Sequence, residues 1–381
     1  MRQLKLDSHG RAVRSPREPD TGGERETNGS VDAGRVLCCK ELGGRREKPR
    51  LRRLSPCRYC DIVEAVCAAP VGGRCYRLSS GASNSLAIRE SPPARHAWPE
   101  NAFRSLSKGF VMKAAYIKGT GSPSRIIYGD LPKPKPVGKQ VLVKVEAVSV
   151  NPIDTYLRSG MVKMDLPSPY IIGCDLAGEV VAAGPEAARF KKGDRVWGSN
   201  QGLLGRQGTF AQFAAVEEDW LYPIPPDVSA ESAAAVALVG ITAHLGLFRC
   251  AQLRDAERVF VSGGSGGVGS CVVQMAKATG AEVVTTASTP AKADICRQLG
   301  ADHVIGLRQR NFAAALAELG PFHVWFETSR KIDFDRVVPM MTLGGRIVVM
   351  AGREARPRFP LGPFYVRDLK LFGFAMFNDP P

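Results

Sequence analysis

A tight cluster of glycines between a predicted strand and a predicted helix constrains the fold of this chain more than any other feature. The stretch VFVSGGSGGVGSCVVQMAK runs from Val259 to Lys277 and passes from an apolar run through the glycines into helical spacing. Gly263, Gly266 and Gly269 are each three residues apart. Such glycines permit a tight turn, let backbone N–H groups approach a pyrophosphate and let the helix pack closely on the strand. The pattern therefore predicts a dinucleotide-binding loop.

The sequence around this loop alternates between strand and helix patterns. We expect strands at Val259–Ser262, Val283–Ala287, His303–Ile305, Val324–Glu327, Arg346–Ala351 and Leu369–Phe374. Helices are predicted between them, for example at Gly267–Thr279 and Lys292–Leu299. This alternation predicts a parallel, doubly wound sheet, and six strands match the full dinucleotide-binding fold.

No acidic residue follows the second predicted strand, where the sequence reads TTASTPAKA. An NAD site places an acid there to bind the ribose hydroxyls. Ser288 and Lys292 lie where a 2′-phosphate would bind, although Lys292 also fits the solvated face of the next helix. We therefore expect the cofactor to be NADP(H).

Residues 112–226 have a different pattern, in which short strands are separated by glycine and proline turns. QVLVKVEAVSV, from Gln140 to Val150, alternates apolar and polar residues as a half-buried strand does. We predict a mostly β domain over residues 112–235, followed by a nucleotide-binding domain over 236–381.

Residues 1–111 lack both periodicities and are strongly basic. They carry 21 Lys and Arg against 12 Asp and Glu, whereas the remaining residues carry 31 against 25. We interpret this region as a disordered extension. Its basic run RREKPRLRRL could contact nucleic acid, but such runs are more often simply solvated, so no nucleic-acid partner is expected. Cys57 and Cys60 form a CxxC pair without a second close pair, so we expect no zinc ribbon here.

Other sequence features bear on the compartment. The chain has no run of eighteen apolar residues and no signal-peptide core, so we expect neither a membrane span nor secretion. Its ten cysteines follow no disulfide pattern, and Cys174, Cys250, Cys271 and Cys296 are expected to be free thiols. These features favour a cytoplasmic protein.

Residues 112–381 resemble the medium-chain dehydrogenase/reductase superfamily, in its zinc-free, zeta-crystallin-like quinone oxidoreductase branch. The motifs occur in the order of that family: NPIDTYLRSG, FKKGDRVWG, GTFAQFA, GITAH, SGGSGGVGSCVVQMAK and ADICRQLGADHVI. The resemblance implies a GroES-like β domain, then a Rossmann domain, with the active site in the cleft between them.

The resemblance also bears on metal binding. Zinc-dependent relatives carry a Cys at the position of Asn151 and a His–Glu pair at Cys174 and Asp175, and their third ligand would fall near Gly240. Two ligands do not make a catalytic zinc site, so we expect no metal in residues 112–381.

The activity implied is hydride transfer from NADPH to a quinone, with a conjugated carbonyl compound as the alternative acceptor. Tyr156 is expected near the nicotinamide and the substrate oxygen, where it either donates a hydrogen bond or only packs on the cofactor. Asn151 is expected to hydrogen-bond near the nicotinamide. Asp154 and Arg158 are expected to fix their loop, and His244 to be structural. The predicted cofactor-binding residues are Gly263, Ser265, Gly266, Gly267, Val268, Gly269, Ser288, Lys292 and Thr242.

Both ends of the chain differ from the family pattern. Relatives begin at about Met112 and continue past the sixth strand, so we expect residues 1–111 to be a tail or sequence upstream of the true start. We also expect the β domain to lack its closing strands. The sixth strand pairs across a dimer in the family, so a homodimer through it is expected. The alternative to an enzyme is an NADP-binding protein with little turnover and an RNA-binding basic arm.

Overall fold

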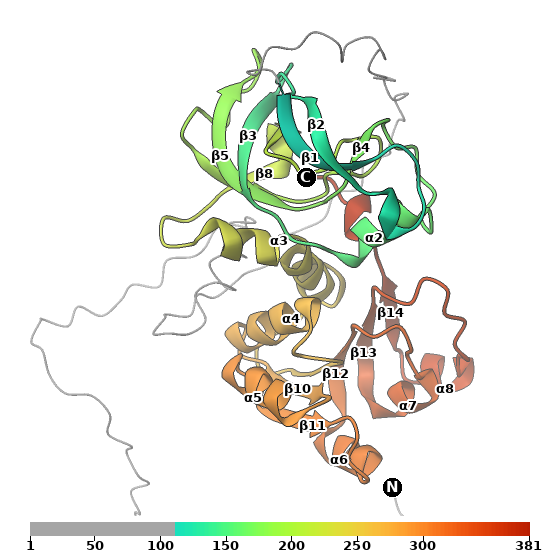
Figure 1. Ribbon diagram of the computed structural model, residues 1–381. Coiled ribbons are helices and arrows are strands. Elements are labelled where there is room, and N and C mark those ends of the chain that lie inside the picture. The colour runs from blue at the N-terminus through green and yellow to red at the C-terminus, as the bar shows by residue number, and fades with distance from the viewer. Residues whose placement is uncertain (1–110) are drawn as a thin grey trace, which may run out of the picture. The chain divides into compact units, whose positions relative to one another are not determined.

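The computed structural model describes residues 111–381. The expected disorder of the N-terminal region, its basic run, and Cys57 and Cys60 lie outside these residues. The described part of the chain contains three sheets, two of them antiparallel and one parallel (Figure 1).

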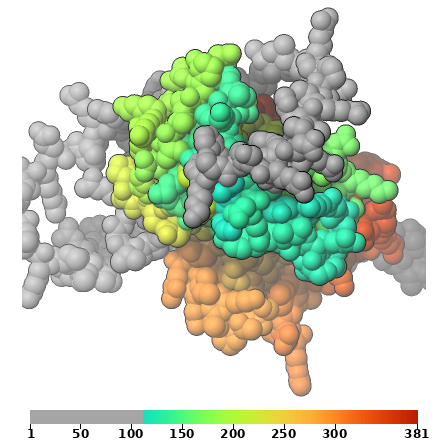
Figure 2. All heavy atoms as spheres, turned by 45° about the horizontal axis from the view of Figure 1, so that its top comes forward, coloured from blue at the N-terminus to red at the C-terminus, as the bar shows by residue number. Residues whose placement is uncertain are grey.

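The first half of the described chain forms the two antiparallel sheets. A three-stranded sheet has the order β2-β1-β4, and a five-stranded sheet has the order β7-β3-β5-β6-β8. The strands are β1 (Val111–Ile117), β2 (Ile127–Pro132), β3 (Gln140–Ala147), β4 (Tyr170–Ile171), β5 (Leu176–Ala183), β6 (Arg195–Gly198), β7 (Phe213–Glu217) and β8 (Leu221–Pro223). The start of the described chain, which contains β1 and β2, is seen in teal in Figure 2. Ile127 and Tyr128 of β2 are exposed.

A long helix follows the β domain. α3 (Ala230–His244) begins where the Ser229 side chain accepts a hydrogen bond from the backbone N–H of Ser232, and it continues as the π-helical turn η4 (Leu245–Cys250). The combined helix is long and apolar enough to cross a membrane, but more than half of it is buried within the protein. It packs against Trp197 on the β-domain side, as a core helix does.

The second half is a six-stranded sheet whose neighbouring strands are all parallel, in the order β11-β10-β9-β12-β13-β14. Its strands are β9 (Arg258–Val261), β10 (Glu282–Ala287), β11 (His303–Gly306), β12 (Phe322–Glu327), β13 (Met341–Val349) and β14 (Lys370–Gly373). The predicted doubly wound sheet is confirmed. β13 begins at Met341 rather than Arg346, because Met341 already pairs with Phe322 ahead of a shift in register.

Helices cover both faces of this sheet. They are α4 (Gly267–Ala278), α5 (Pro290–Gln298), α6 (Phe312–Leu319), α7 (Phe334–Val337) and α8 (Leu361–Val366). In β9, Val259 and Val261 join a core with α3, α4 and α5, whereas Phe260 points to the core under α6 and α7. Both faces of the strand are therefore buried, which explains its unbroken apolar run.

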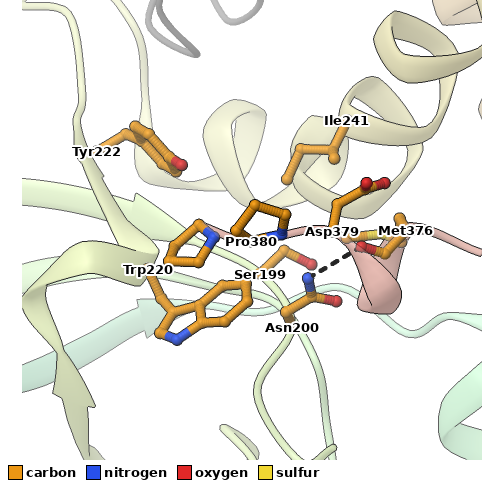
Figure 3. Close-up of a pocket in the computed structure, with 9 residues that line it drawn as sticks. Ser199, Asn200, Trp220, Tyr222, Ile241, Met376, Asp379 and Pro380 are labelled. Carbon is orange, nitrogen blue, oxygen red and sulfur yellow. Dashed lines mark hydrogen bonds between the residues drawn. The ribbon is translucent and has the colours of Figure 1, made fainter. Parts of the chain in front are cut away.

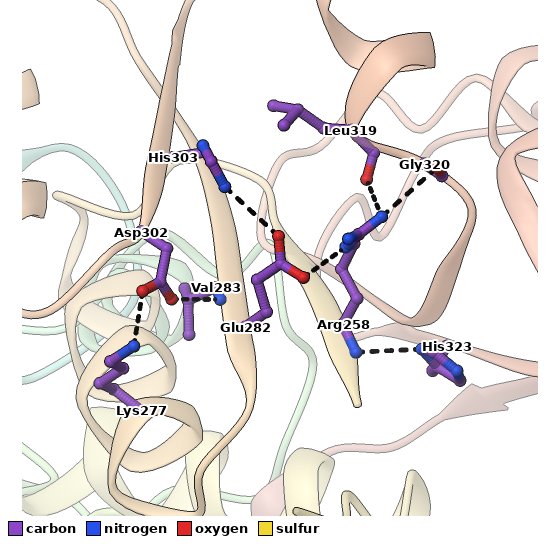
Figure 4. Close-up of polar contacts among 9 residues, drawn as sticks. All are labelled: Arg258, Lys277, Glu282, Val283, Asp302, His303, Leu319, Gly320 and His323. Carbon is purple, nitrogen blue, oxygen red and sulfur yellow. Dashed lines mark hydrogen bonds and ion pairs between the residues drawn. The ribbon is translucent and has the colours of Figure 1, made fainter. Parts of the chain in front are cut away.

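Polar contacts link neighbouring elements at the end of the sheet where β9, β10 and β11 begin (Figure 4). Arg258 Nε lies 2.7 Å from Glu282 Oε2, and His303 Nε2 lies 3.3 Å from Glu282 Oε1. Lys277 Nζ lies 2.5 Å from Asp302 Oδ1. Because the strands are parallel, the glycine loop lies at their opposite ends.

β14 is the last strand at one edge of the sheet, and Leu371 on it is exposed. After β14 the chain returns to the β domain. There the side-chain amide of Asn200 donates to the Met376 carbonyl at 3.4 Å. Asp379 pairs with Arg249 of η4.

Candidate active site

The glycine loop joins β9 to α4, and its conformation depends on glycine at two positions. Gly263 has φ +73°, a left-handed conformation that favours glycine. A Cβ on Gly269 would lie 2.2 Å from the carbonyl oxygen of Gly263. The start of α4 therefore packs directly on the turn, as the glycine spacing predicts.

Two threonines of β10 form hydrogen bonds with the backbone of the glycine loop. Thr286 Oγ1 accepts a hydrogen bond from the N–H of Gly263 at 2.9 Å, and Thr285 Oγ1 accepts one from the N–H of Gly264 at the same distance. A Cβ on Gly264 would lie 2.4 Å from Thr285 Oγ1. These two backbone groups are thus used inside the protein rather than offered to a ligand.

The groups offered to a ligand lie one turn further along. Gly266 is the N-cap of α4 and has no side chain that could accept a hydrogen bond from the first N–H groups of the helix. The carbonyl of Gly266 accepts the first hydrogen bond within the helix, from the N–H of Ser270 at 2.8 Å. The first N–H groups of a helix have no partner within it, and they attract anions. Here they belong to Gly267, Val268 and Gly269. Ser265 lies half-buried in the loop just before them.

Ser288 and Lys292 lie beyond the carboxyl end of β10, the strand that pairs with β9 ahead of the glycine loop. Ser288 directly follows β10 and is half-buried, whereas Lys292 is exposed in the first turn of α5. The hydroxyl of Thr289 caps that helix and accepts from the N–H of Lys292 at 3.3 Å. Thr242, on α3, donates its hydroxyl to the carbonyl of Leu238 at 2.8 Å. Its predicted contact with the cofactor stays a prediction.

Tyr156 lies on α2 (Pro152–Ser159) of the β domain, and an arginine of the Rossmann domain reaches it. Arg330 follows the carboxyl end of β12, and its Nη2 lies 2.9 Å from the Tyr156 hydroxyl oxygen. The phenol is therefore at the same edge of the parallel sheet as the glycine loop. This contact joins the predicted catalytic residue to the edge of the sheet that carries the predicted cofactor site.

The buried carboxyl group of Asp175 fixes the segment before α2. We call Asp175 and the three side chains that donate to it, those of Ser149, Asn151 and Ser199, the Asp175 cluster. Asp175 Oδ2 accepts from the Ser149 hydroxyl at 2.5 Å and from the Asn151 amide at 2.7 Å. Its Oδ1 accepts from the Ser199 hydroxyl at 2.5 Å. The backbone N–H of Leu238 in α3 adds a contact of 3.3 Å to Oδ2. Four separate segments thus meet at one carboxyl group.

Burial dominates the electrostatics of this region. It raises the pKa of Asp175 to about 6, although hydrogen bonds from Ser149, Ser199 and Asn151 act in the opposite direction. Burial likewise raises the pKa of the neighbouring Asp154 and holds that of the Cys174 thiol well above its ordinary value.

These contacts also indicate whether the residues at the zinc-ligand positions of the family could bind a zinc ion. The amide nitrogen of Asn151 is a hydrogen-bond donor here, both oxygens of Asp175 accept hydrogen bonds, and the thiol of Cys174 is fully buried. Within residues 111–381, no group of three or more His, Cys, Asp or Glu is arranged to hold a metal ion. The residues at these positions do not fit a catalytic zinc ion.

The loop-fixing residues act separately. Asp154 accepts from the backbone N–H of Asn151 at 2.7 Å and so closes the first turn of α2. Arg158 donates to the carbonyl of Gly121. His244, at the end of α3, packs its ring 5.0 Å from that of Phe248.

A small hollow between the β domain and α3 does not coincide with the predicted site (Figure 3). It is lined by Ser199, Asn200, Trp220, Tyr222, Ile241, Met376, Asp379, Pro380 and Pro381. Neither Tyr156 nor the glycine loop contributes to it.

Sequence reasoning missed Thr285, Thr286 and Arg330. The two threonines lie in the last half of β10, the strand beside β9, and Arg330 lies just past another strand of the same sheet. Polar residues near the carboxyl ends of parallel strands are the signal that could have found all three.

Comparisons with known proteins agree with this architecture. Residues 138–226 match the family described as "Alcohol dehydrogenase GroES-like domain", and residues 267–381 match "Zinc-binding dehydrogenase". The human quinone oxidoreductase is 31% identical over 277 residues, which cover 71% of this chain and 82% of that protein.

Solved structures show the same fold. A mycobacterial protein solved in complex with NADPH is 29% identical, with a TM-score of 0.62 over 70% of this chain and 82% of that one. The enoyl reductase CurK, at 22% identity and a TM-score of 0.60, covers 70% of this chain and 82% of its own, and shares the fold. The chain, with its GroES-like domain, its Rossmann sheet and its quinone oxidoreductase relatives, therefore belongs to the quinone oxidoreductase family of the medium-chain dehydrogenase/reductase superfamily.

Proposed function

We propose that this chain reduces quinones with a hydride from NADPH, without a metal ion. The observation that carries the proposal is the 2.9 Å contact between Arg330 and Tyr156, which holds a phenol at the carboxyl edge of the parallel sheet. Ligands of open parallel sheets bind at this edge, so the phenol is placed to meet a substrate that lies against the cofactor.

The residues present fit a dinucleotide with a 2′-phosphate. The N–H groups at the start of α4 would bind the pyrophosphate, in the space that the side-chain-free Gly266 and Gly267 leave exposed. The Ser288 hydroxyl and the Lys292 ammonium group would bind the 2′-phosphate. The absence of an acid after β10 and the NADPH complex of the mycobacterial relative both support this choice.

For hydride transfer to a quinone, the main task of the protein is to position the reactants. The reduced nicotinamide, when bound, supplies the hydride. A quinone is electrophilic enough to accept it without a Lewis acid, so the chain has to orient the acceptor and exclude water. The hydroxyl of Tyr156 donates to the acceptor's carbonyl oxygen, where negative charge develops. The Asp175 cluster holds Asn151 and thus the start of α2, which carries Tyr156.

NADPH oxidation by the full 381-residue chain tests the proposal. We expect turnover with 1,4-benzoquinone, unchanged by a metal chelator, and a fall in kcat of roughly 10- to 100-fold in Tyr156→Phe. Tyr365→Phe changes an exposed tyrosine on α8 and is the matched control. Turnover only with an α,β-unsaturated ketone would change the acceptor class, and turnover with neither acceptor would refute the proposal.

A further inference from the structure

Two loops of the Rossmann domain each reach the α2 segment with an arginine. Arg330, after β12, contacts the hydroxyl of Tyr156, and its guanidinium carbon lies 6.0 Å from the centre of that ring. Arg353, after β13, donates to the carbonyl of Met161 at 2.7 Å. A Cβ on Gly352 would lie 2.9 Å from the Arg330 carbonyl, so the two loops are side by side.

The direction of the hydrogen bond between Arg330 and Tyr156 follows from their chemistry. A guanidinium group has five N–H donors and no acceptor, so the phenol oxygen must be the acceptor in this contact. The hydroxyl hydrogen of Tyr156 is therefore not used by Arg330. With one lone pair of the oxygen engaged by Arg330, the O–H bond can point only toward a different acceptor.

We propose that Arg330 is a positioning residue that turns the O–H of Tyr156 toward the carbonyl oxygen of the substrate. The proposal rests on the proposed function. As the hydride from NADPH adds to the quinone, the phenol O–H bond breaks and its proton goes to the quinone oxygen, and solvent then returns a proton to Tyr156. NADPH is oxidised and the quinone is reduced to the hydroquinone. Arg330 takes part in none of these bonds and acts only through the phenol.

A double-mutant cycle in the full chain tests the coupling. We expect Arg330→Met to lower kcat about 3- to 10-fold, the size of one lost hydrogen bond, while KM for NADPH changes less than about 2-fold. In a Tyr156→Phe background Arg330→Met should cost nothing further, because the group it orients is gone. Arg330→Lys keeps a cationic donor and should recover part of kcat.

Arg353→Met is the matched comparison, because it removes an arginine contact to the same segment without touching the phenol. Any effect of Arg353→Met should persist in full when combined with Tyr156→Phe. If Arg330→Met is equally additive with Tyr156→Phe, or leaves kcat unchanged in an active enzyme, the proposal is overturned.

A measurement without turnover separates this proposal from the proposed function. The tyrosine Raman doublet reports whether a phenol oxygen accepts a hydrogen bond, and the difference between wild type and Tyr156→Phe isolates this one tyrosine. We expect an accepting oxygen in the wild type and a changed doublet in Arg330→Met, even if no quinone is reduced. An identical Tyr156 signal in both would contradict the orientation by Arg330.

Discussion

The glycine loop and the Asp175 cluster both set the geometry of the predicted site, but they are built in opposite ways. The loop is one contiguous stretch whose shape is set by backbone conformation and by the absence of side chains at Gly263 and Gly269. The Asp175 cluster is a set of side chains from separate segments that meet at one buried carboxyl group. The first is specified locally, whereas the second exists only once the β domain has folded.

This difference has an energetic consequence. A buried carboxyl group with several donors is costly to leave incomplete, because each donor left behind is buried without a partner. A glycine loop fails sterically instead, through contact of an added Cβ with nearby backbone. We therefore expect substitutions in the cluster to act first on stability, and substitutions in the loop to act on cofactor binding as well.

The largest effect is expected for Asp175→Ala. It leaves Ser149, Asn151 and Ser199 without their acceptor, and should lower the free energy of unfolding by about 3 to 5 kcal/mol. Urea unfolding followed by fluorescence checks this, since Trp197 is buried in the same domain. Asp165→Ala, at an exposed acid, should stay within about 0.5 kcal/mol. Equal effects of the two changes would mean that the cluster does not hold the domain.

The pH dependence of stability provides a second test of the Asp175 cluster. The pKa of Asp175 is about 6 in the folded protein against an ordinary value of 3.8, so the folded state binds more protons between these values. The contribution of this group to stability is complete below the lower value and is lost as pH rises through the upper one.

Asp175→Asn carries no titratable group at this position and should lack that loss. The stability of wild type relative to Asp175→Asn is thus expected to fall by about 2 kcal/mol between pH 4 and pH 7, as measured by urea unfolding at each pH. A difference that is constant, or that rises with pH, would show that Asp175 is not buried with a raised pKa.

A smaller effect on stability is expected for Gly269→Ala in the loop. The added methyl group meets the backbone of Gly263, and overpacking of this kind costs about 1 to 3 kcal/mol. NADPH binding, measured by titration, should weaken by about 10-fold or more because the turn is displaced. Gly119→Ala meets nothing within 4 Å and is the control. Unchanged NADPH affinity in Gly269→Ala would separate the loop from the cofactor.

The smallest effect concerns the choice of cofactor. Lys292→Ala removes an exposed cation beside Ser288 and should weaken NADPH binding by about 5-fold, while NADH binding stays nearly unchanged. Arg297→Ala, at the far end of the same helix, should affect neither cofactor. An equal loss for both cofactors would refute the assignment of the 2′-phosphate site.

The contrast between a loop specified locally and a cluster of distant side chains explains which features could be predicted from the sequence. The glycine spacing and the strand–helix alternation are local patterns, and they gave the parallel sheet and its loop correctly. Thr285 and Thr286 were hidden because they lie within a strand pattern and act on a loop of another strand. The contact between Arg330 and Tyr156 joins residues 174 positions apart, and only the assembled fold brings them together.

Asp175 is a similar case. Its residue type and position suggested only a substitute for a metal ligand, because the sequence does not indicate that Ser149, Ser199 and the backbone of Leu238 surround it. Polar contacts between distant segments depend on side-chain directions that a linear pattern does not contain.

The polar contacts at the starts of β9, β10 and β11 have a consequence for how such a chain can change over evolutionary time. Arg258, Glu282 and His303 lie at one end of the strands, and the residues that would recognise ligands lie at the other. Substitutions that change which substrate is bound can therefore accumulate at the carboxyl ends of the strands. The contacts at the amino ends meanwhile keep the strands in register. A family built in this way can diversify its substrates without first finding a new scaffold.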